Sequence, residues 1–453
     1  MRPLRSFTSS LAGALALAGP AVAQDALRFH LLRYQDDVRP LAAASLPDWR
    51  YRRLGEWGQI TFGGELRTRI ERTSEPGLGR LGSGADGYGL HRALLHADVR
   101  VQGGWRAFVQ IGAFPSTGKD TALPPAHDDL DLQQGFIELA RPVGEGRAFV
   151  RVGRQEIALG SQRLVALRDG PNARRAFDGA RASYARGEMT VDVLALRPVE
   201  QRRGVFDNRT ADHEALIGLY ATLPAPGSLP GALDVYSLGY ERPHGVFAST
   251  SGPERRWSWG VRAFGRGGGW DWDAEATLQT GRVGQENVLA WGLATDSGRT
   301  LDLGPIRARL GLKADIASGD RRPDDGVLNT ANAMYPKLPY LGSAGAFAPS
   351  NIIDLHPNLT LSRDALSVTV GYQAVWRQTA RDAVYVAPLL PLAGTAGRGG
   401  RFSAHQWPVD LLWRPSPNWQ VDASVAWVEV SQDLKAAGAR DSTFAFASLT
   451  YRF

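Results

Sequence analysis

Apolar and polar residues alternate with a period of two along most of the chain. In PIRARLGLKADI, residues 305–316, isoleucine, leucine and alanine fill one phase, and arginine, lysine and aspartate fill the other. The segments WDWDAEATLQT (270–280) and LSVTVGYQAVWR (366–377) follow the same pattern. Successive side chains of a β-strand point to opposite faces of a sheet. Each segment therefore predicts a strand with one apolar and one polar face.

About eighteen such segments lie between residue 57 and the C-terminus, and bacterial single-chain barrels have an even number. They are expected to begin near residues 58, 88, 105, 130, 147, 174, 188, 212, 232, 257, 269, 287, 305, 355, 366, 402, 418 and 442. Connections after even-numbered segments are mostly short, as at Gly103-Gly104. Those after odd-numbered segments are mostly long: 73–87, 116–129, 157–173, 198–211, 243–256, 318–354 and 380–401.

This sorting of connections predicts the fold class. Short turns on one rim and long loops on the other are typical of an outer-membrane barrel with its short turns in the periplasm. A soluble sandwich or propeller has no reason to sort its loops in this way. We expect an all-β protein, a transmembrane antiparallel β-barrel of about 18 strands with short periplasmic turns and long extracellular loops.

The start of the chain has a different character. Arg2 and Arg5 precede a Leu- and Ala-rich stretch that ends in the small-residue cleavage signal Ala21-Val22-Ala23. We interpret residues 1–23 as a signal peptide, because the apolar run is shorter than the ~20 residues of a spanning helix. Residues 24–56 are expected to form an N-terminal periplasmic segment, which either plugs the mouth of the barrel or merely precedes it. We expect residues 57–453 to form the barrel, in the outer membrane of a Gram-negative cell.

The segment GGELRTRIER, residues 63–72, shows which face points inward. A charge that faces lipid at mid-depth costs about 2–4 kcal/mol, and every backbone polar group in lipid needs a partner. The charged phase, Glu65, Arg67, Arg69 and Glu71, must therefore face the lumen. A barrel of this size leaves an aqueous channel, narrowed by whatever loops fold in.

Composition refines this prediction. The absence of cysteine excludes disulfides, thiolate metal sites and thiol nucleophiles. Of 52 basic residues only four are lysines, and arginine is suited to bidentate recognition of carboxylate or phosphate. A GC-rich genome would produce the same bias. No nucleic-acid partner and no cofactor are expected.

Three motifs occur in a specific order: GGELRTRIE within 49–71, GRQE within 152–165 and RAFDG within 168–184. Together they resemble the alginate export family of outer-membrane proteins, over nearly the whole mature chain. The resemblance implies an eighteen-stranded barrel with a constricted, arginine-lined pore that passes an anionic polysaccharide out of the cell. The matching positions for pore function are Arg67, Arg69, Arg151, Arg154, Gln155, Arg174 and Arg175. The strand alternation adds Glu65, Glu138, Arg307, Arg309, Lys313 and Arg377 as pore-lining candidates.

Several alternatives remain open at this stage. Acidic residues in the lumen phase would pair with the arginines and hold the wall rigid, as in general porins. Uptake of small anionic or oligosaccharide solutes is the nearest rival to polymer export. For export, a periplasmic partner or synthesis in the inner membrane would supply the driving force, and outer-membrane lipids would surround the wall.

Other sequence signals are weaker. Asp212-His213 with Asp324-Asp325 would suit a barrel hydrolase, and the long loops would suit an adhesin or receptor, but we expect no enzyme and no catalytic residues. The GLGRLG motif at 77–82 lies in a predicted loop, so no dinucleotide site is expected. Acidic loop clusters lack the spacing of a Ca²⁺ loop, and no metal is expected. The loop 318–354 is too long for an idle connection, so we predict that it folds over or into the pore as a gate or constriction.

Overall fold

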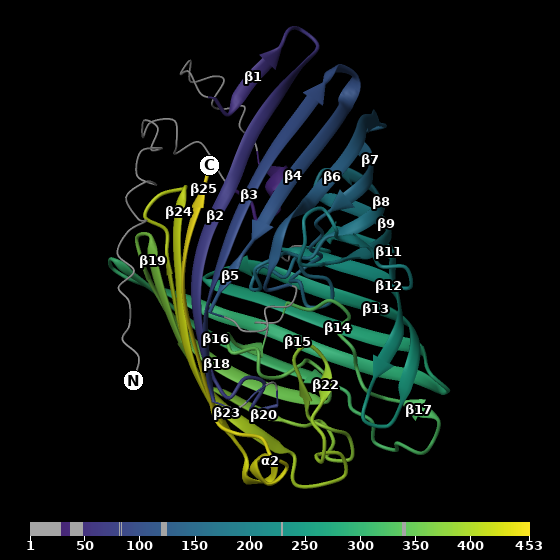
Figure 1. Ribbon diagram of the computed structural model, residues 1–453, viewed down its shortest axis with the longest axis vertical. Coiled ribbons are helices and arrows are strands. Elements are labelled where there is room, and N and C mark those ends of the chain that lie inside the picture. The colour runs from purple at the N-terminus through teal and green to yellow at the C-terminus, as the bar shows by residue number, and fades with distance from the viewer. Residues whose placement is uncertain are drawn as a thin grey trace.

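The computed structural model describes residues 29–36, 49–80, 82, 84–118, 125–227, 230–337 and 341–453. They form a closed antiparallel barrel of 18 strands, with β1 and the C-terminus at the upper end of Figure 1 and α2 at the lower end. The fold class is therefore confirmed. The predicted signal peptide and residues 37–48 lie outside the described residues.

The wall strands follow the chain order, each pairing with the next. They are β2 (Gly58–Ser74), β3 (Ala85–Val101), β4 (Trp105–Phe114), β6 (Asp128–Val143), β7 (Gly146–Gln155), β8 (Phe177–Arg186), β9 (Met189–Glu200), β11 (Ala215–Pro224), β12 (Ala232–Val246), β13 (Ser251–Gly267), β14 (Trp270–Val283), β15 (Glu286–Leu303), β16 (Ile306–Ala317), β18 (Ile352–Arg363), β19 and β20 (Leu366–Gly371, Gln373–Trp376), β23 (Phe402–Trp413), β24 (Trp419–Val430) and β25 (Ser442–Arg452). Pairing of β2 with β25, from Glu65 opposite Arg452 to Thr73 opposite Phe444, closes the barrel.

Short elements decorate this wall. They are η3 (Arg33–Gln35), β1 (Tyr51–Leu54), η4 (Gln102–Gly104), β5 (Ser116–Thr117), β10 (Arg209–Thr210), β17 (Val327–Leu328), β21 (Tyr385–Val386), β22 (Leu390–Pro391) and α2 (Gln432–Ala436). β1 pairs antiparallel with the start of β2 and forms a short hairpin with it. No helix in the described part of the chain is long and apolar enough to cross a membrane.

The predicted strand starts agree with the structure, and the largest difference is the strand expected at 257 that begins at Ser251. The predicted long loop at 243–256 is wrong, because β12 continues to Val246 and β13 begins at Ser251, which leaves only residues 247–250 between them. Ion pairs explain this extension. Glu254 lies 2.7 Å from both Arg242 and Arg256, so a buried carboxylate binds two cations beyond the expected strand ends.

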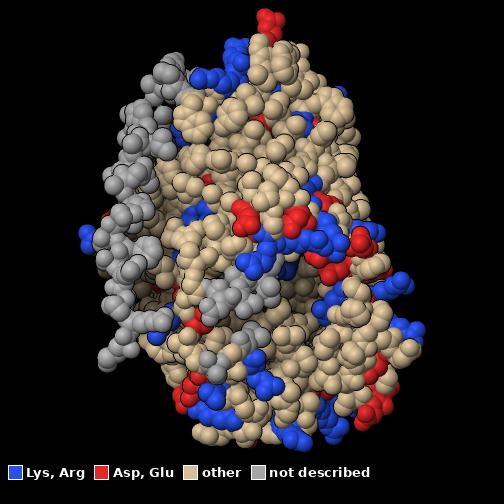
Figure 2. Space-filling view, viewed as in Figure 1, with Lys and Arg blue, Asp and Glu red and all other residues tan. Residues whose placement is uncertain are grey.

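The faces of the strands are as the alternation predicts. On β2, Leu66 and Ile70 are 43% and 64% exposed on the outer wall, while Glu65 and Arg67 are buried inside. Figure 2 shows a broad surface with few charged side chains across the upper half of the view, and charged side chains gathered lower down. An outer surface with so few charges is what lipid requires of a spanning barrel.

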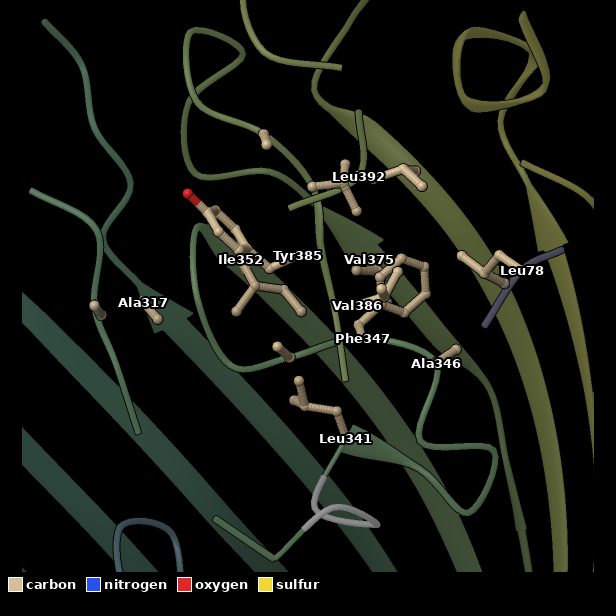
Figure 3. Close-up of a cluster of buried hydrophobic side chains, with 14 of the residues drawn as sticks. Leu78, Ala317, Leu341, Ala346, Phe347, Ile352, Val375, Tyr385, Val386 and Leu392 are labelled. Carbon is tan, nitrogen blue, oxygen red and sulfur yellow. The ribbon is translucent and has the colours of Figure 1, made fainter. Parts of the chain in front are cut away.

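The lower end of the barrel is filled by its long loops. Loops 75–84, 318–351, 377–401 and 431–441 bring apolar side chains together in one cluster (Figure 3), which includes Leu78, Leu341, Phe347, Tyr385, Val386, Leu392 and Leu434. Burial of these side chains stabilises the loops against one another, at about 1.5–3 kcal/mol for each fully buried large one. The loops therefore form a packed cap rather than separate mobile arms.

Candidate functional site

The connection between β7 and β8, residues 156–176, folds into the lumen and is fastened to the wall by ion pairs. Its Arg174 lies 3.1 Å from Glu65 on β2 and 2.7 Å from Asp169 of the same loop. Arg92 on β3 reaches both carboxylates, at 3.0 Å from Glu65 and 2.7 Å from Asp169. Arg452 on β25 is also 3.0 Å from Glu65. This cluster, which we call the loop anchor, joins the loop to three wall strands.

Arg67 belongs to the loop anchor as well. Its guanidinium donates to the carbonyl oxygens of Asp169 at 2.7 Å and of Pro171 at 2.9 Å. Arg92 donates to the same two carbonyls, at 3.0 and 2.8 Å. Arginine is suited to this role because its planar guanidinium group can donate hydrogen bonds to several acceptors at once. Arg67 and Arg174 are therefore buried between the loop and the wall, with exposures of 6% and 0%.

A second long connection, residues 318–351 between β16 and β18, also enters the barrel. Asn332 donates to Glu254 on β13 at 3.0 Å, and Gln279 on β14 donates to the carbonyl oxygen of Asn332 at 2.7 Å. Tyr335 packs edge-on against Phe177 and Tyr240, with ring centres 5.3 Å apart in both cases. The predicted inward folding of this loop agrees with these contacts, while its action as a gate stays a prediction.

One stretch of the inner wall departs from the expected polar character. Leu194 and Leu196 on β9, Leu216 on β11 and Leu238 on β12 face inward and are buried. They pack with Ile157 and Leu159 of the first inward loop and with Met334 and Tyr335 of the second. The prediction that every inward-facing strand residue contacts water is therefore wrong here, because two loops exclude water from this part of the wall.

A cavity of 620 Å³ lies between the inward loops and the rim of short turns. It reaches from the turn residues Pro230 and Gly231 to Ser161 of the first inward loop. The described residues that line it include six basic side chains, Arg163, Arg262, Arg266, Arg309, Lys313 and Lys337, and three acidic ones, Asp271, Asp273 and Asp296. We call it the basic cavity, because its lining has a formal excess of positive charge that attracts anions.

Ion pairs hold part of this lining. Arg309 lies 3.0 Å from Asp296 and donates to Asp271 at 2.9 Å. Arg262 bridges Asp234 and Asp273 at 2.7 and 2.6 Å. Arg163 of the first inward loop lies 2.7 Å from Asp273, so this loop is also bound to β14.

Four cations of the basic cavity, two of them ion-paired, are partly or fully exposed to solutes. Arg266 and Lys337 are exposed, and the side chains of Arg309 and Lys313 are 24% and 28% exposed. Lys313 lies 3.9 Å from Asp296, which is a loose pair. A passing carboxylate can therefore approach these four cations without first breaking a buried network.

The remaining predicted pore residues lie elsewhere. Arg151 pairs with Glu138 at 2.5 Å, and the Arg154 Nε lies 2.9 Å from Asp178. Gln155 is fully buried and donates to the Gly179 carbonyl at 3.4 Å. These contacts brace neighbouring wall strands.

Four more predicted residues have separate environments. The Arg175 guanidinium lies 4.7 Å from the ring centre of Tyr335, between the two inward loops. Arg307 is exposed near the turn at 304–305. Arg69 stacks on Phe446 at 3.5 Å and pairs with Glu71. Arg377 is buried at the start of the loop 377–401, where it binds carbonyl oxygens rather than lining the lumen.

Sequence reasoning missed several residues of the basic cavity. Arg262 and Arg266 occupy the inward phase of a strand whose outward phase carries Trp257, Trp259 and Val261, so the alternation could have found them. Lys337 comes from a long loop without periodicity, and nothing local places it at a cavity. Within the described residues, no group of three or more histidines and carboxylates is arranged to hold a metal ion.

The family model described as "Alginate export" matches residues 58–448, which is the barrel from its first wall strand to its last. The chain belongs to the alginate export family. Among curated proteins, none matches this family member. The matched residues include the wall strands and both inward loops.

Solved structures from Pseudomonas aeruginosa share the fold. OccK11 (OpdR) is 13% identical with a TM-score of 0.55, over 87% of this chain and 96% of that one. OccK2 (OpdF) is 11% identical with a TM-score of 0.57, over 87% and 97%. OccK2 in complex with glucuronate superposes with a TM-score of 0.54 at 11% identity, over 87% and 98%. This family member is therefore an outer-membrane β-barrel with the architecture of these porins.

Proposed function

We propose that this protein is a channel without catalytic activity that carries an anionic polysaccharide, such as alginate, outward across the outer membrane. The observation that carries the proposal is the basic cavity at the periplasmic end, where an exported polymer would enter. Its exposed cations, Arg266 and Lys337, are placed to meet the carboxylates of an arriving chain. Family membership supports the same direction of transport.

The mixture of exposed and ion-paired cations suits transport better than tight capture. A polyuronate carries one carboxylate per sugar, so each exposed guanidinium or ammonium replaces one of its counterions. Carboxylates such as Asp271 and Asp296 already neutralise part of Arg309, which keeps each contact weak. Conduction needs binding that is favourable enough for entry and weak enough for release.

The inward loops favour a second candidate, uptake of single uronates or short oligosaccharides. Residues 156–176 and 318–351 both enter the lumen and are bound to its wall, which narrows the path for a bulky chain. OccK2, which shares the fold, has been solved with glucuronate. In either case the outer wall would contact lipid, and residues 1–23 would direct export of the chain.

Ion selectivity in planar bilayers tests the proposal. The reversal potential in a KCl gradient should show anion preference, and polymannuronate added on the side of the short turns should block the current. In a Lys337→Gln, Arg266→Gln double variant, we expect weaker anion preference and a half-blocking concentration about tenfold higher, since tenfold corresponds to about 1.4 kcal/mol.

A matched control removes a cation from the outer wall. Arg299 stacks over the exposed ring of Trp270, with its guanidinium 5.5 Å from the ring centre, so Arg299→Gln should leave selectivity and block unchanged. Cation preference, or no block by polymannuronate, would refute an anionic substrate. Equal block by monomeric glucuronate and polymer would refute polymer export and support uptake.

A further inference from the structure

A second cavity, of 330 Å³, borders a different part of the first inward loop. Gly170, Pro171 and Asn172 of that loop border it, and their position is fixed by the loop anchor. Strands β2, β3 and β25 form its wall, and Ser343 to Ala346 of the second inward loop also contribute to the lining. We call it the outer cavity, because it adjoins the long loops at 76–78 and 343–346 rather than the short turns.

Three polar side chains on the wall of the outer cavity form a connected group. Arg69 pairs with Glu71, and the Tyr88 hydroxyl donates to the second Glu71 oxygen at 2.6 Å. The side chains of Arg69 and Glu71 are 12% and 10% exposed, so they reach the cavity without being open to bulk solvent. The Arg69 guanidinium also stacks on Phe446 at 3.5 Å, which fixes its plane.

The charge of the outer cavity differs from that of the basic cavity. Among the described residues that line it, Arg69 and Glu71 are the charged ones, and they neutralise each other. A ligand carboxylate in the outer cavity would compete with Glu71 for Arg69, and the negative charge of Glu71 would repel it. A ring hydroxyl, which both donates and accepts, can bond to the guanidinium and the carboxylate together.

Apolar groups complete the lining. Leu78, Leu90 and Phe444 border the same cavity. A pyranose presents C–H groups on its ring face and hydroxyls at its edge, which matches an apolar surface beside a paired donor and acceptor. The volume lies at the lower end of the ~300–1,000 Å³ range of small-molecule sites, which suits one or two sugar units.

We propose that the outer cavity is a saccharide subsite that recognises the uncharged, hydroxyl-rich face of a pyranose through Arg69, Glu71 and Tyr88. The inference deepens the proposed function and rests on it, because a saccharide meets a site beside the long loops only if it passes through the channel. The channel then has two unlike subsites, a cationic one at the short-turn end and a neutral one at the long-loop end.

Current block by a neutral oligosaccharide, maltohexaose, tests this subsite. Added to the compartment that the long loops face, it should block the current at lower concentration than from the opposite side. Glu71→Gln and Tyr88→Phe should each raise the half-blocking concentration about tenfold, as expected for one lost hydrogen bond to a charged group. Tyr88→Phe should leave the anion preference in a KCl gradient unchanged, and Glu71→Gln, which removes the acidic charge beside Arg69, should not weaken it.

The control variant removes a tyrosine hydrogen bond of the same kind at a different place in the barrel. The Tyr372 hydroxyl lies 2.6 Å from His405 on the outer wall, so Tyr372→Phe removes a similar hydrogen bond outside the lumen and should leave the block unchanged. Normal heat-dependent gel mobility would show that each variant is folded. No block by maltohexaose, or block that Glu71→Gln and Tyr88→Phe leave intact, would overturn the subsite while anion preference could still hold. Loss of anion preference in the wild type would instead refute the proposed function.

Discussion

Glu65 on β2 and Arg174 in the first inward loop form an ion pair across 109 residues of sequence, with Glu65 Oε2 and Arg174 Nη2 3.1 Å apart. Neither side chain is more than 1% exposed. The same carboxylate also binds Arg92 and Arg452, each at 3.0 Å. One acidic side chain therefore holds three cations, and through them a loop, against the barrel wall.

Glu65→Gln should destabilise the protein strongly. The change removes one of the two carboxylates that Arg92 and Arg174 share, and breaking a buried pair in this way costs about 3–5 kcal/mol. We expect a lower urea midpoint for the loss of the folded gel form. Glu145→Gln is the control, because its pair with Arg186 is exposed, and a change above about 1 kcal/mol there would contradict this account.

Glu156, the first residue of the first inward loop, should make the free energy of unfolding depend on pH. Its side chain is fully buried, and burial raises the pKa of Glu156 to about 7. The folded state then binds a proton that the unfolded state has lost, so stability falls as pH rises from about 4.5 to about 7 and is level above that. The loss is up to about 3 kcal/mol.

Unfolding midpoints measured between pH 5 and pH 8 check this expectation. Glu156→Gln should flatten the dependence, because the amide has no proton to lose, while the exposed-site variant Glu145→Gln should keep the wild-type slope. A slope that Glu156→Gln leaves unchanged would show that another group causes it.

Arg377 should control the order of the loop 377–401. Its guanidinium donates to the carbonyl oxygens of Thr395 at 2.5 Å, Arg398 at 2.7 Å and Asp382 at 3.2 Å. In Arg377→Ala these carbonyls lose their donor, and hydrogen bonds to a charged group are worth about 1.5–3 kcal/mol each. We expect proteinase K to cut this loop in intact cells at least about tenfold faster.

The exposed Arg381, which donates to a single carbonyl at 3.3 Å, provides the comparison for that experiment. Arg381→Ala should be cut at the wild-type rate. Ion selectivity should be unchanged in both variants, and a selectivity change in Arg377→Ala would place this residue closer to the conducting path than its contacts indicate.

The outer wall should tolerate charge only near its edges. Ile137, near the middle of β6, and Leu303, at the end of β15, are 58% and 57% exposed. Ile137→Arg places a charge deep in lipid, at about 2–4 kcal/mol, whereas Leu303→Arg near the interface costs about 0–1 kcal/mol. Equal yields of folded barrel from the two variants in outer-membrane fractions would contradict the assignment of faces.

Local sequence determined the barrel and its faces. Lipid imposes one apolar phase on every wall strand, so the period of two in a segment such as GGELRTRIER is enough to send Leu66 and Ile70 outward and Glu65 and Arg67 inward. Turn residues marked where most strands end, because each hairpin is a short-range feature. The prediction that a strand begins near residue 257 was wrong, because the buried ion pairs of Glu254 extend this strand back to Ser251.

Tertiary structure alone decided which inward residues can meet a solute. Arg67 binds the carbonyl of Asp169, which is 102 residues away, and this contact removes Arg67 from the channel. Lys337 comes from a loop with no periodicity, yet it borders the basic cavity together with Arg266 and Lys313. The alternation of apolar and polar residues along a strand predicts only on which face of the sheet a side chain lies. Whether that face meets water, a carbonyl or a leucine depends on which distant loop folds over it, and such long-range contacts leave no mark in the local pattern.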